Sequence, residues 1–405
     1  MPPTSPPVVP LRTIAGRWLW IGLTGFGGPP AHITLLRQLC VDRRRWINAE
    51  EFEDGIAACN LLPGPASTQL AIYSAWRLRG PAGAIVGGLG FILPGLVAIL
   101  ALSALLLEGE PNRWILAAAA GAGAAVAAVA IRAAADLIPP SWQRATTDAA
   151  AGGEARPERG ASASEPRSPG HHATRSRLRW LVYAVAGVVA AAVVGAWVVV
   201  VLLLAGLAEA IARRAPGPSR TLALALPVGL TGGLAWTAFK VGALSYGGGF
   251  VIIPLMQADA VDRYGWMTSS QFLYAVALGQ ITPGPVVHTV AVVGYAAAGL
   301  AGAFLAAVVA FGPSFVFILA GARHFDRLRA NTTVAAFLTG AGPAAIGAIG
   351  GSAVVLALAL SHLWQVGVLA LAMVWLVALR RGVVTTLLGA ALLGVAAAAL
   401  GWPVS

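Results

Sequence analysis

The sequence predicts an all-α, polytopic integral membrane protein with two homologous halves in inverted topology and roughly ten to twelve membrane segments. Three observations lead to this prediction. Only 11% of the 405 residues are charged, whereas 58% are hydrophobic. A long segment recurs at an offset of about 220 residues, which indicates a duplication. Arginine residues are distributed differently between the matched loops of the two copies.

The low charge content requires a surface that faces lipid. A soluble domain carries about 25% charged residues, more than twice the 11% of this chain. Apolar tracts at 81–107, 112–137 and 180–212 approach or exceed the length of about 20 residues that crosses a bilayer. The alternating segments of a membrane β-barrel are absent from the sequence. The 49 glycines and 26 prolines lie within apolar sequence, so we expect closely packed helices that contain breaks.

Composition divides the chain into segments. One stretch is rich in Ser, Pro, Ala, Gly and Arg, and such a composition is typical of a disordered linker, here on the cytoplasmic side. The first ten residues lack the features of a cleaved signal peptide. We expect an N-terminal tail (1–10), the core of the first repeat (11–138), the linker (139–179), a hairpin of two short helices that breaks near Gly195 (180–220), and the second repeat (221–405).

The internal repeat is clearest at uncommon residue types. An offset of 220 aligns the glycine cluster Phe26-Gly27-Gly28 with Tyr246-Gly247-Gly248. The same offset aligns Pro63-Gly64-Pro65 with Pro283-Gly284-Pro285. An offset of 219 then aligns Pro94 with Pro313, after a single slip of one residue. The two halves of the chain are therefore homologous.

The arginines indicate how the halves face the membrane. Segment 37–54 carries four arginines and its counterpart one, whereas the loop at 108–113 carries one and its counterpart three. Because Lys and Arg are enriched in cytoplasmic loops, matched loops with opposite bias are expected on opposite faces. The net charge of +11 therefore reports topology, and we expect no nucleic-acid partner.

The sequence lacks the motifs of the common enzyme classes. No histidine is followed by glutamate, which excludes the HExxH metalloprotease motif, and neither a P-loop nor a nucleophile elbow is present. Cys40 and Cys59 are too few for a structural zinc or iron–sulfur site. We expect no enzyme activity, no metal and no cofactor.

The two Pro-Gly-Pro motifs interrupt apolar runs and are the first candidate sites. Proline breaks a helix, and a break inside a membrane is tolerated only where protein or a watery cavity meets the freed backbone groups. The helix that resumes near Ala66 or Val286 directs free N–H groups and a positive dipole end toward that point, which suits an anion. Neutral polar residues flank both motifs, namely Asn60, Ser67, Thr68 and Gln69 in the first half and Gln280, His288 and Thr289 in the second. The alternative is a packing kink in which these groups only satisfy freed carbonyls.

The glycine clusters at 25–30 and 245–249 are a second pair of breaks, where backbone can approach a substrate or another helix. Lys240 is an intramembrane cation that would offset the charge of an anion, unless it snorkels to the interface. His32 is a candidate proton carrier or a packing histidine. Further candidates are Glu53, Asp54 and Asp259 for protons and Arg37 and Arg43 to Arg45 for collecting anions, with solvated loop faces and topology as the alternatives.

Taken together, Phe26-Gly27-Gly28-Pro29 with Pro63-Gly64-Pro65, and Tyr246-Gly247-Gly248-Gly249 with Pro283-Gly284-Pro285, resemble the chromate transporter family in its long form of two fused halves. The resemblance implies a multi-pass protein of the bacterial inner membrane that exports chromate, a tetrahedral oxyanion, with protons as the coupling ion. Transport of sulfate or another oxyanion, a passive anion channel and a membrane-embedded enzyme stay open as alternatives. A homodimer also stays open.

The halves differ at matched positions, so we expect unequal roles. Examples are His32 against Ile252 and Ser67 against Val287. We expect the first half to hold most substrate contacts, with Lys240 or His288 completing the site. Transport is expected to follow alternating access, in which one repeat moves against the other around a midplane site.

The inversion predicts opposite exposure of two matched loops. Single cysteines introduced at Gly109 and Arg327, in a background without Cys40 and Cys59, should react with an impermeant thiol reagent from opposite faces of the membrane. Labelling of both positions from the same face would contradict the inverted topology.

Overall fold

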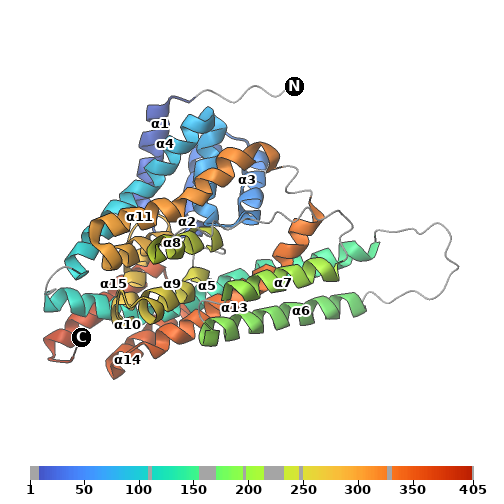
Figure 1. The fold of residues 1–405 in the computed structure, drawn as a ribbon. Coiled ribbons are helices and arrows are strands. Elements are labelled where there is room, and N and C mark those ends of the chain that lie inside the picture. Colours follow the sequence, from blue (N-terminus) through green and yellow to red (C-terminus); the bar gives the residue numbers. More distant parts are fainter. Residues whose placement is uncertain are drawn as a thin grey trace, which may run out of the picture.

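The computed structural model describes residues 9–107, 112–154, 170–194, 198–213, 232–245, 250–325 and 331–403 (Figure 1). Within these ranges the chain forms helices and turns and contains no strand, so the all-α prediction is confirmed. The first half contains α1 (Leu11–Thr24), α2 (Pro29–Arg37), η1 (Gln38–Arg43), α3 (Ala49–Leu61), α4 (Ala66–Leu107), α5 (Arg113–Glu154), α6 (Gly170–Val189), η2 (Ala190–Val194) and α7 (Val198–Ala212).

The second half repeats this order. It contains α8 (Gly233–Leu244), η4 (Phe250–Ile252), α9 (Ile253–Gln257), η5 (Ala258–Arg263), α10 (Ser269–Ile281), η6 (Val286–His288), α11 (Thr289–Gly321), η7 (Ala322–His324), α13 (Thr332–Leu358), α14 (Leu363–Met373), η8 (Val374–Ala378) and α15 (Val383–Ala399). By the sequence repeat, α1 corresponds to α8, α3 to α10, α4 to α11 and α5 to α13.

The helices pack in two groups. In one group α4 packs against α1, α11 packs against α8, and α4 and α11 pack against each other. In the other group α5 packs against α13, α14 and α15, while α13 packs against α6 and α7, which lie alongside it in Figure 1. The corresponding helices α4 and α11, and likewise α5 and α13, are thus direct neighbours.

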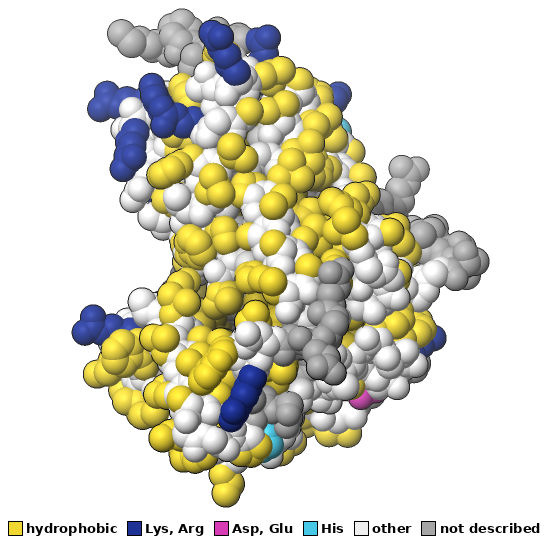
Figure 2. Space-filling view, turned by 90° about the vertical axis from the view of Figure 1, so that its left-hand side faces the viewer, with side chains coloured by type: hydrophobic (Ala, Val, Ile, Leu, Met, Phe, Trp, Pro, Cys, Tyr) yellow, Lys and Arg dark blue, Asp and Glu magenta, His cyan; other side chains and the backbone are white. Residues whose placement is uncertain are grey.

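The helices are suited to a bilayer. Within the described ranges, five are long and apolar enough to cross one, at Ala66–Leu107, Arg113–Ala145, Thr174–Val193, Val286–His324 and Thr332–Leu358, and three apolar helices are shorter. Figure 2 shows hydrophobic side chains across the middle of one face, with most of the visible Lys and Arg at its upper end and others in its lower part. The chain is therefore a multi-pass membrane protein.

The predicted helix breaks at the Pro-Gly-Pro motifs are confirmed, and each lies at the tip of a hairpin. α3 ends at Leu61 and α4 begins at Ala66, while a Cβ added at Gly55 in α3 would lie 2.6 Å from the Tyr73 ring in α4. Positions 55 and 73 are equally far from Gly64, so the two arms are antiparallel. The second hairpin is built in the same way: a Cβ added at Gly279 would lie 2.0 Å from Thr289 Oγ1, and these two positions are equally far in sequence from Gly284.

A second reversal follows each hairpin, inside α4 and α11. The backbone leaves helical geometry at Arg79–Gly80 and at Ala298–Gly299, and the two glycines have nearly identical angles (φ 59°, ψ −151° and φ 59°, ψ −152°). After the turn the chain packs back on itself, since Gly302 lies against Gly294. The arm from Ala66 to Leu78 is then about 20 Å long at 1.5 Å per residue, too short for a core of about 30 Å. Each hairpin is therefore re-entrant.

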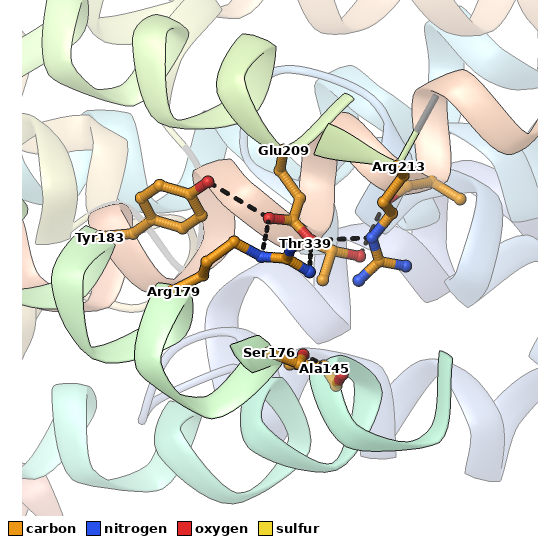
Figure 3. A network of polar contacts seen from close by, with 8 residues as sticks. Ala145, Ser176, Arg179, Tyr183, Glu209, Arg213 and Thr339 are labelled. Carbon is orange, nitrogen blue, oxygen red and sulfur yellow. Dashed lines mark hydrogen bonds and ion pairs between the residues drawn. The ribbon is translucent and has the colours of Figure 1, made fainter. Parts of the chain in front are cut away.

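The arrangement of α6 and α7 is fixed by a buried carboxylate. Glu209 of α7 is 2% exposed and pairs with Arg179 of α6 at 3.0 Å and with Arg213 at 2.8 Å (Figure 3). Tyr183 also donates a hydrogen bond to Glu209, at 3.2 Å. The start of the apolar part of α6 therefore lies beside the end of α7, and the two helices are antiparallel. The predicted break at Gly195 lies outside the described residues.

The helices extend further into segment 139–179 than expected for a disordered linker. α5 continues to Glu154 and α6 begins at Gly170, while residues 155–169 lie outside the described part. The ends are held together by aromatic packing, since the Trp142 and Trp180 rings are 5.1 Å apart edge to face. Trp180 Nε1 donates to Ser141 Oγ at 3.0 Å. Composition alone underestimated how far the two helices extend, because the contact that joins them is between tryptophans that are far apart in the sequence.

Close glycine contacts hold α5 against α15, and they predict a stability change. A Cβ at Gly121 would lie 2.1 Å from the Ala390 carbonyl oxygen, whereas a Cβ at Gly389 would meet nothing within 4 Å. Gly121→Ala should lower stability by about 1–3 kcal/mol through overpacking, and Gly389→Ala should leave it unchanged or raise it by up to about 1 kcal/mol. Thermal unfolding of the purified variants in detergent, followed by tryptophan fluorescence, measures the difference. Equal melting temperatures would contradict the packing of α5 on α15.

Candidate functional site

The two hairpin tips, Pro63–Pro65 and Pro283–Pro285, have the same backbone form. Gly64 has φ of 117° and Gly284 has φ of 92°, a region that side-chain-bearing residues rarely adopt. The following prolines, Pro65 and Pro285, have no N–H to donate and precede the first helical residue of the resumed helix. Each tip therefore directs the free N–H groups of a helix start into the protein interior.

Each tip packs against the other half of the chain. The Gly284 N–H donates a hydrogen bond to the Gly25 carbonyl oxygen at 3.0 Å. A Cβ at Gly95 would lie 2.1 Å from the Pro283 carbonyl oxygen. Conversely, a Cβ at Gly64 would lie 3.2 Å from the Gly242 carbonyl oxygen and 3.4 Å from Ser314 Oγ. The two repeats are interlocked, and each candidate site contains groups from both.

His32 connects the first glycine cluster to the first tip. Its ring is fully buried, with Nε2 2.9 Å from the Gly25 carbonyl oxygen and Nδ1 3.2 Å from Ser67 Oγ. Because a carbonyl oxygen only accepts, Nε2 carries the hydrogen, and in the neutral ring Nδ1 accepts from the Ser67 hydroxyl. Gly25 thus accepts from His32 and Gly284 together, which links the histidine to the second tip.

The residues around the first tip are partly accessible and partly unpaired. Gln69 Nε2 donates to the Pro63 carbonyl oxygen at 2.7 Å and holds the tip in shape. Ser67, Thr68 and Gln69 are buried, and Thr68 Oγ1 and Gln69 Oε1 have no hydrogen-bond partner among the described residues. The exposed predicted residues here are Phe26, Gly27, Asn60 and Pro63, with Gly28 half-buried.

The second tip is sealed. Gln280, Pro283, Gly284, Pro285, His288 and Thr289 are all buried. His288 packs edge to face on Phe311 at 5.2 Å, and its two ring nitrogens have no hydrogen-bond partner among the described residues. Thr289 Oγ1 donates to the Val286 carbonyl oxygen at 2.8 Å. The polar groups of this tip are thus less available to a ligand than those of the first.

Lys240 is placed beside a carboxylate rather than at a tip. Its Nζ lies 2.5 Å from Asp259 Oδ2, which also accepts from Thr237 Oγ1 at 2.7 Å. Asp259 is 1% exposed, and Lys240 also lies over the Trp236 ring at 5.8 Å. The lysine charge is therefore balanced within the protein. The predicted partners Tyr246, Gly247 and Gly248 lie outside the described residues.

The remaining charged candidates lie at the open end of the first hairpin. Arg37 pairs with Glu53, and Arg77 pairs with Glu51, which joins α4 to the start of α3. Both Arg37 and Glu53 are about half exposed, and Glu53 lies near the start of α3, away from the end that leads to the first tip. Within the described ranges, no group of three or more His, Cys, Asp or Glu residues is arranged to hold a metal.

Sequence reasoning missed Ser314, which the fold brings to the first tip. Its Oγ is fully buried and has no hydrogen-bond partner among the described residues. The available signal was the repeat itself, because an offset of 219 pairs Ser314 with Gly95, directly after the matched Pro313 and Pro94. Asp259 is expected from the sequence to be a proton site or part of a solvated loop face, and the second expectation is wrong because Asp259 is buried and pairs with Lys240.

The buried ion pair predicts a coupled effect on stability. Asp259→Asn should destabilise the protein by about 3–5 kcal/mol because it leaves the Lys240 charge without a partner. The double variant Lys240→Met, Asp259→Asn should recover most of that loss, since it removes both charges. Thermal unfolding of the two variants and of Lys240→Met completes a double-mutant cycle. Additive effects would contradict a direct pair.

Comparison with known proteins gives a consistent result. The family model described as "Chromate transporter" matches residues 12–229 and again 232–397, two matches that begin 220 residues apart. The chain is 31% identical to a chromate transport protein of Pseudomonas aeruginosa, over 87% of this chain and 82% of that protein. A chromate transport protein of Cupriavidus metallidurans is also 31% identical (87% and 84% covered), and a probable one of Synechococcus elongatus is 29% identical (91% and 91%). No solved structure matches the chain.

Proposed function

We propose that this chain, which belongs to the chromate transporter family, is a secondary active transporter that exports chromate across the bacterial inner membrane. The family and the relatives named as chromate transport proteins support chromate as the substrate. The observation in the structure that carries the proposal is the pair of re-entrant tips, which direct two helix starts into the protein interior. Helix starts stabilise anions through their free N–H groups and positive dipole ends.

The chemistry of the tips suits a tetrahedral oxyanion. The buried side chains near the first tip are neutral hydroxyl and amide groups, which donate hydrogen bonds without holding the anion by a fixed full charge. Sulfate has the same shape and charge as chromate, so competition between the two is the main question of specificity.

Coupling to protons is part of the proposal, with His32 as the carrier. In the neutral ring, Nδ1 accepts a hydrogen bond from the Ser67 hydroxyl. Ser67 lies in the first turn of α4, directly after the first tip. A proton on Nδ1 would convert this acceptor into a donor and force the Ser67 hydroxyl to reorient. Protonation of His32 would in this way change the donors that are available beside the first tip.

Alternating access requires the interlocked contacts to rearrange. The Gly284 N–H bond to Gly25 and the contact between Gly95 and Pro283 join the two repeats at their centre. Movement of one repeat against the other must break these contacts in one of the two states. His32 donates a hydrogen bond to the same Gly25 carbonyl oxygen, so a movement that breaks the bond between Gly284 and Gly25 also affects the surroundings of His32.

Transport in proteoliposomes tests the function. We expect uptake of radiolabelled chromate that is accelerated by an imposed pH gradient and reduced by a protonophore, with sulfate added as a competitor. Flux that is independent of the gradient would indicate a passive channel instead. Transport of sulfate without transport of chromate would overturn the assigned substrate.

Substitution of the first tip tests its role in that activity. A Cβ at Gly64 would lie 2.7 Å from Gln69 Nε2, at a φ that disfavours side chains, whereas a Cβ at Gly312 would meet nothing within 4 Å. Gly64→Ala should lower chromate flux on the order of 100-fold, the size of effect that a displacement of about 1 Å produces. Gly312→Ala should retain flux. Normal flux in correctly inserted Gly64→Ala protein would remove the first tip from the mechanism.

A further inference from the structure

We propose that the two tips have different roles: the first, Pro63–Pro65, binds the oxyanion with Ser314 of the second repeat as a substrate-binding residue, and the second, Pro283–Pro285, is closed by His288 and binds none. This assignment rests on the proposed transport of an oxyanion and specifies where it binds. Four independent differences between the tips support it.

The first difference is the number of free backbone donors. α4 begins as an α-helix, and its first intrahelical bond at this end runs from the Gln69 N–H to the Pro65 carbonyl, at 3.0 Å. The N–H groups of Ala66, Ser67 and Thr68 therefore have no acceptor within the helix. At the second tip the chain begins with a 3₁₀ turn, in which the His288 N–H already bonds to Pro285 at 3.0 Å. The first tip thus offers one more backbone donor.

The second difference is the kind of unpaired group, because the first tip has unpaired hydroxyls, whereas the unpaired atoms at the second tip are nitrogens of Gln280 and His288. Thr68 Oγ1 and Ser314 Oγ are buried and have no hydrogen-bond partner among the described residues. Ser314 Oγ lies 3.4 Å from the position of a Cβ on Gly64, so it faces the tip. A buried hydroxyl without a partner is unfavourable, and an oxyanion that accepts from it removes that cost.

The third difference is a complementary exchange of side chains. At matched positions Thr68 corresponds to His288, and Gly95 corresponds to Ser314. At the second tip the His288 ring occupies the space beside Gly95, where a Cβ would lie 2.6 Å from ring atom Cε1. At the first tip the same two positions hold two hydroxyl side chains. The exchange places hydroxyl donors at the first tip and an imidazole ring at the second.

The fourth difference is access. Pro63 and Asn60 are exposed, whereas their counterparts Pro283 and Gln280 are buried. In this conformation the first tip therefore reaches the surface of the protein, whereas the second is enclosed by it. The buried charges elsewhere do not compete for the anion, because Lys240 is paired with Asp259 and Arg179 with Glu209.

The test is the KM for chromate in proteoliposomes. Ser314→Ala should raise KM about tenfold or more, the expected loss of a hydrogen bond to a charged group, and Ser314→Thr, which keeps the hydroxyl, should recover much of it. The matched control is Ser103→Ala, because Ser103 is equally buried but already donates to the Ile99 carbonyl oxygen at 2.7 Å. Ser103→Ala should leave KM unchanged. Melting temperatures of all three variants should stay close to that of the wild type.

Two results would overturn the assignment. If the wild type transports chromate and Ser314→Ala has the same KM as Ser103→Ala, Ser314 is not a binding residue, while the proposed function stands. If the wild type transports no oxyanion, both the function and the assignment of the tips are wrong.

Discussion

The structure depends on one constraint, that a helix broken inside a membrane must find partners for its backbone within the protein. Each repeat contains such a break at a Pro-Gly-Pro tip, and each tip packs against the other repeat. The Gly284 N–H bonds to Gly25, and the first tip packs on Gly242 and Ser314. The two halves are therefore packed together around the tips.

The same constraint explains the close packing of glycines near the tips. Gly95 and Gly242 each lie against a backbone carbonyl. A Cβ added at Gly95 would lie 2.1 Å from the Pro283 carbonyl oxygen, and one added at Gly242 would lie 2.0 Å from the Ala310 carbonyl oxygen, which is too close for any side chain. The high glycine content is therefore used where backbone must approach backbone. The surrounding apolar surface faces lipid and contributes little to association between helices, so packing at these contacts has to hold the core together.

Duplication has preserved the backbone while side chains diverged. Gly80 and Gly299 have almost the same dihedral angles, and both tips have a glycine with positive φ. Polar residues, in contrast, are unequally shared. The Lys240–Asp259 pair occurs at positions held by Trp20 and Leu39 in the first half. A symmetric frame that carries asymmetric side chains provides one accessible anion site and one closed tip.

Much of the fold could be predicted from the sequence, because the signals are local. Apolar length gives the membrane segments, Pro-Gly-Pro gives the breaks, and the repeat gives the two halves; α4 begins at Ala66, as expected. The interlocking of the tips could not be predicted, because it joins residues such as Gly25 and Gly284 that no local pattern relates. For the same reason Lys240 was expected near the anion, whereas the fold pairs it with Asp259. Ser314 reaches the first tip only through tertiary packing.

The most direct measurement is the position of the bound anion. A crystal structure of the protein with chromate, using the anomalous scattering of chromium, would locate it without reference to any mutation. The account predicts one peak at the first tip, within hydrogen-bond distance of Ser314 Oγ and the N–H groups of residues 66–68. A peak beside His288 at the second tip, or beside Lys240, would contradict it.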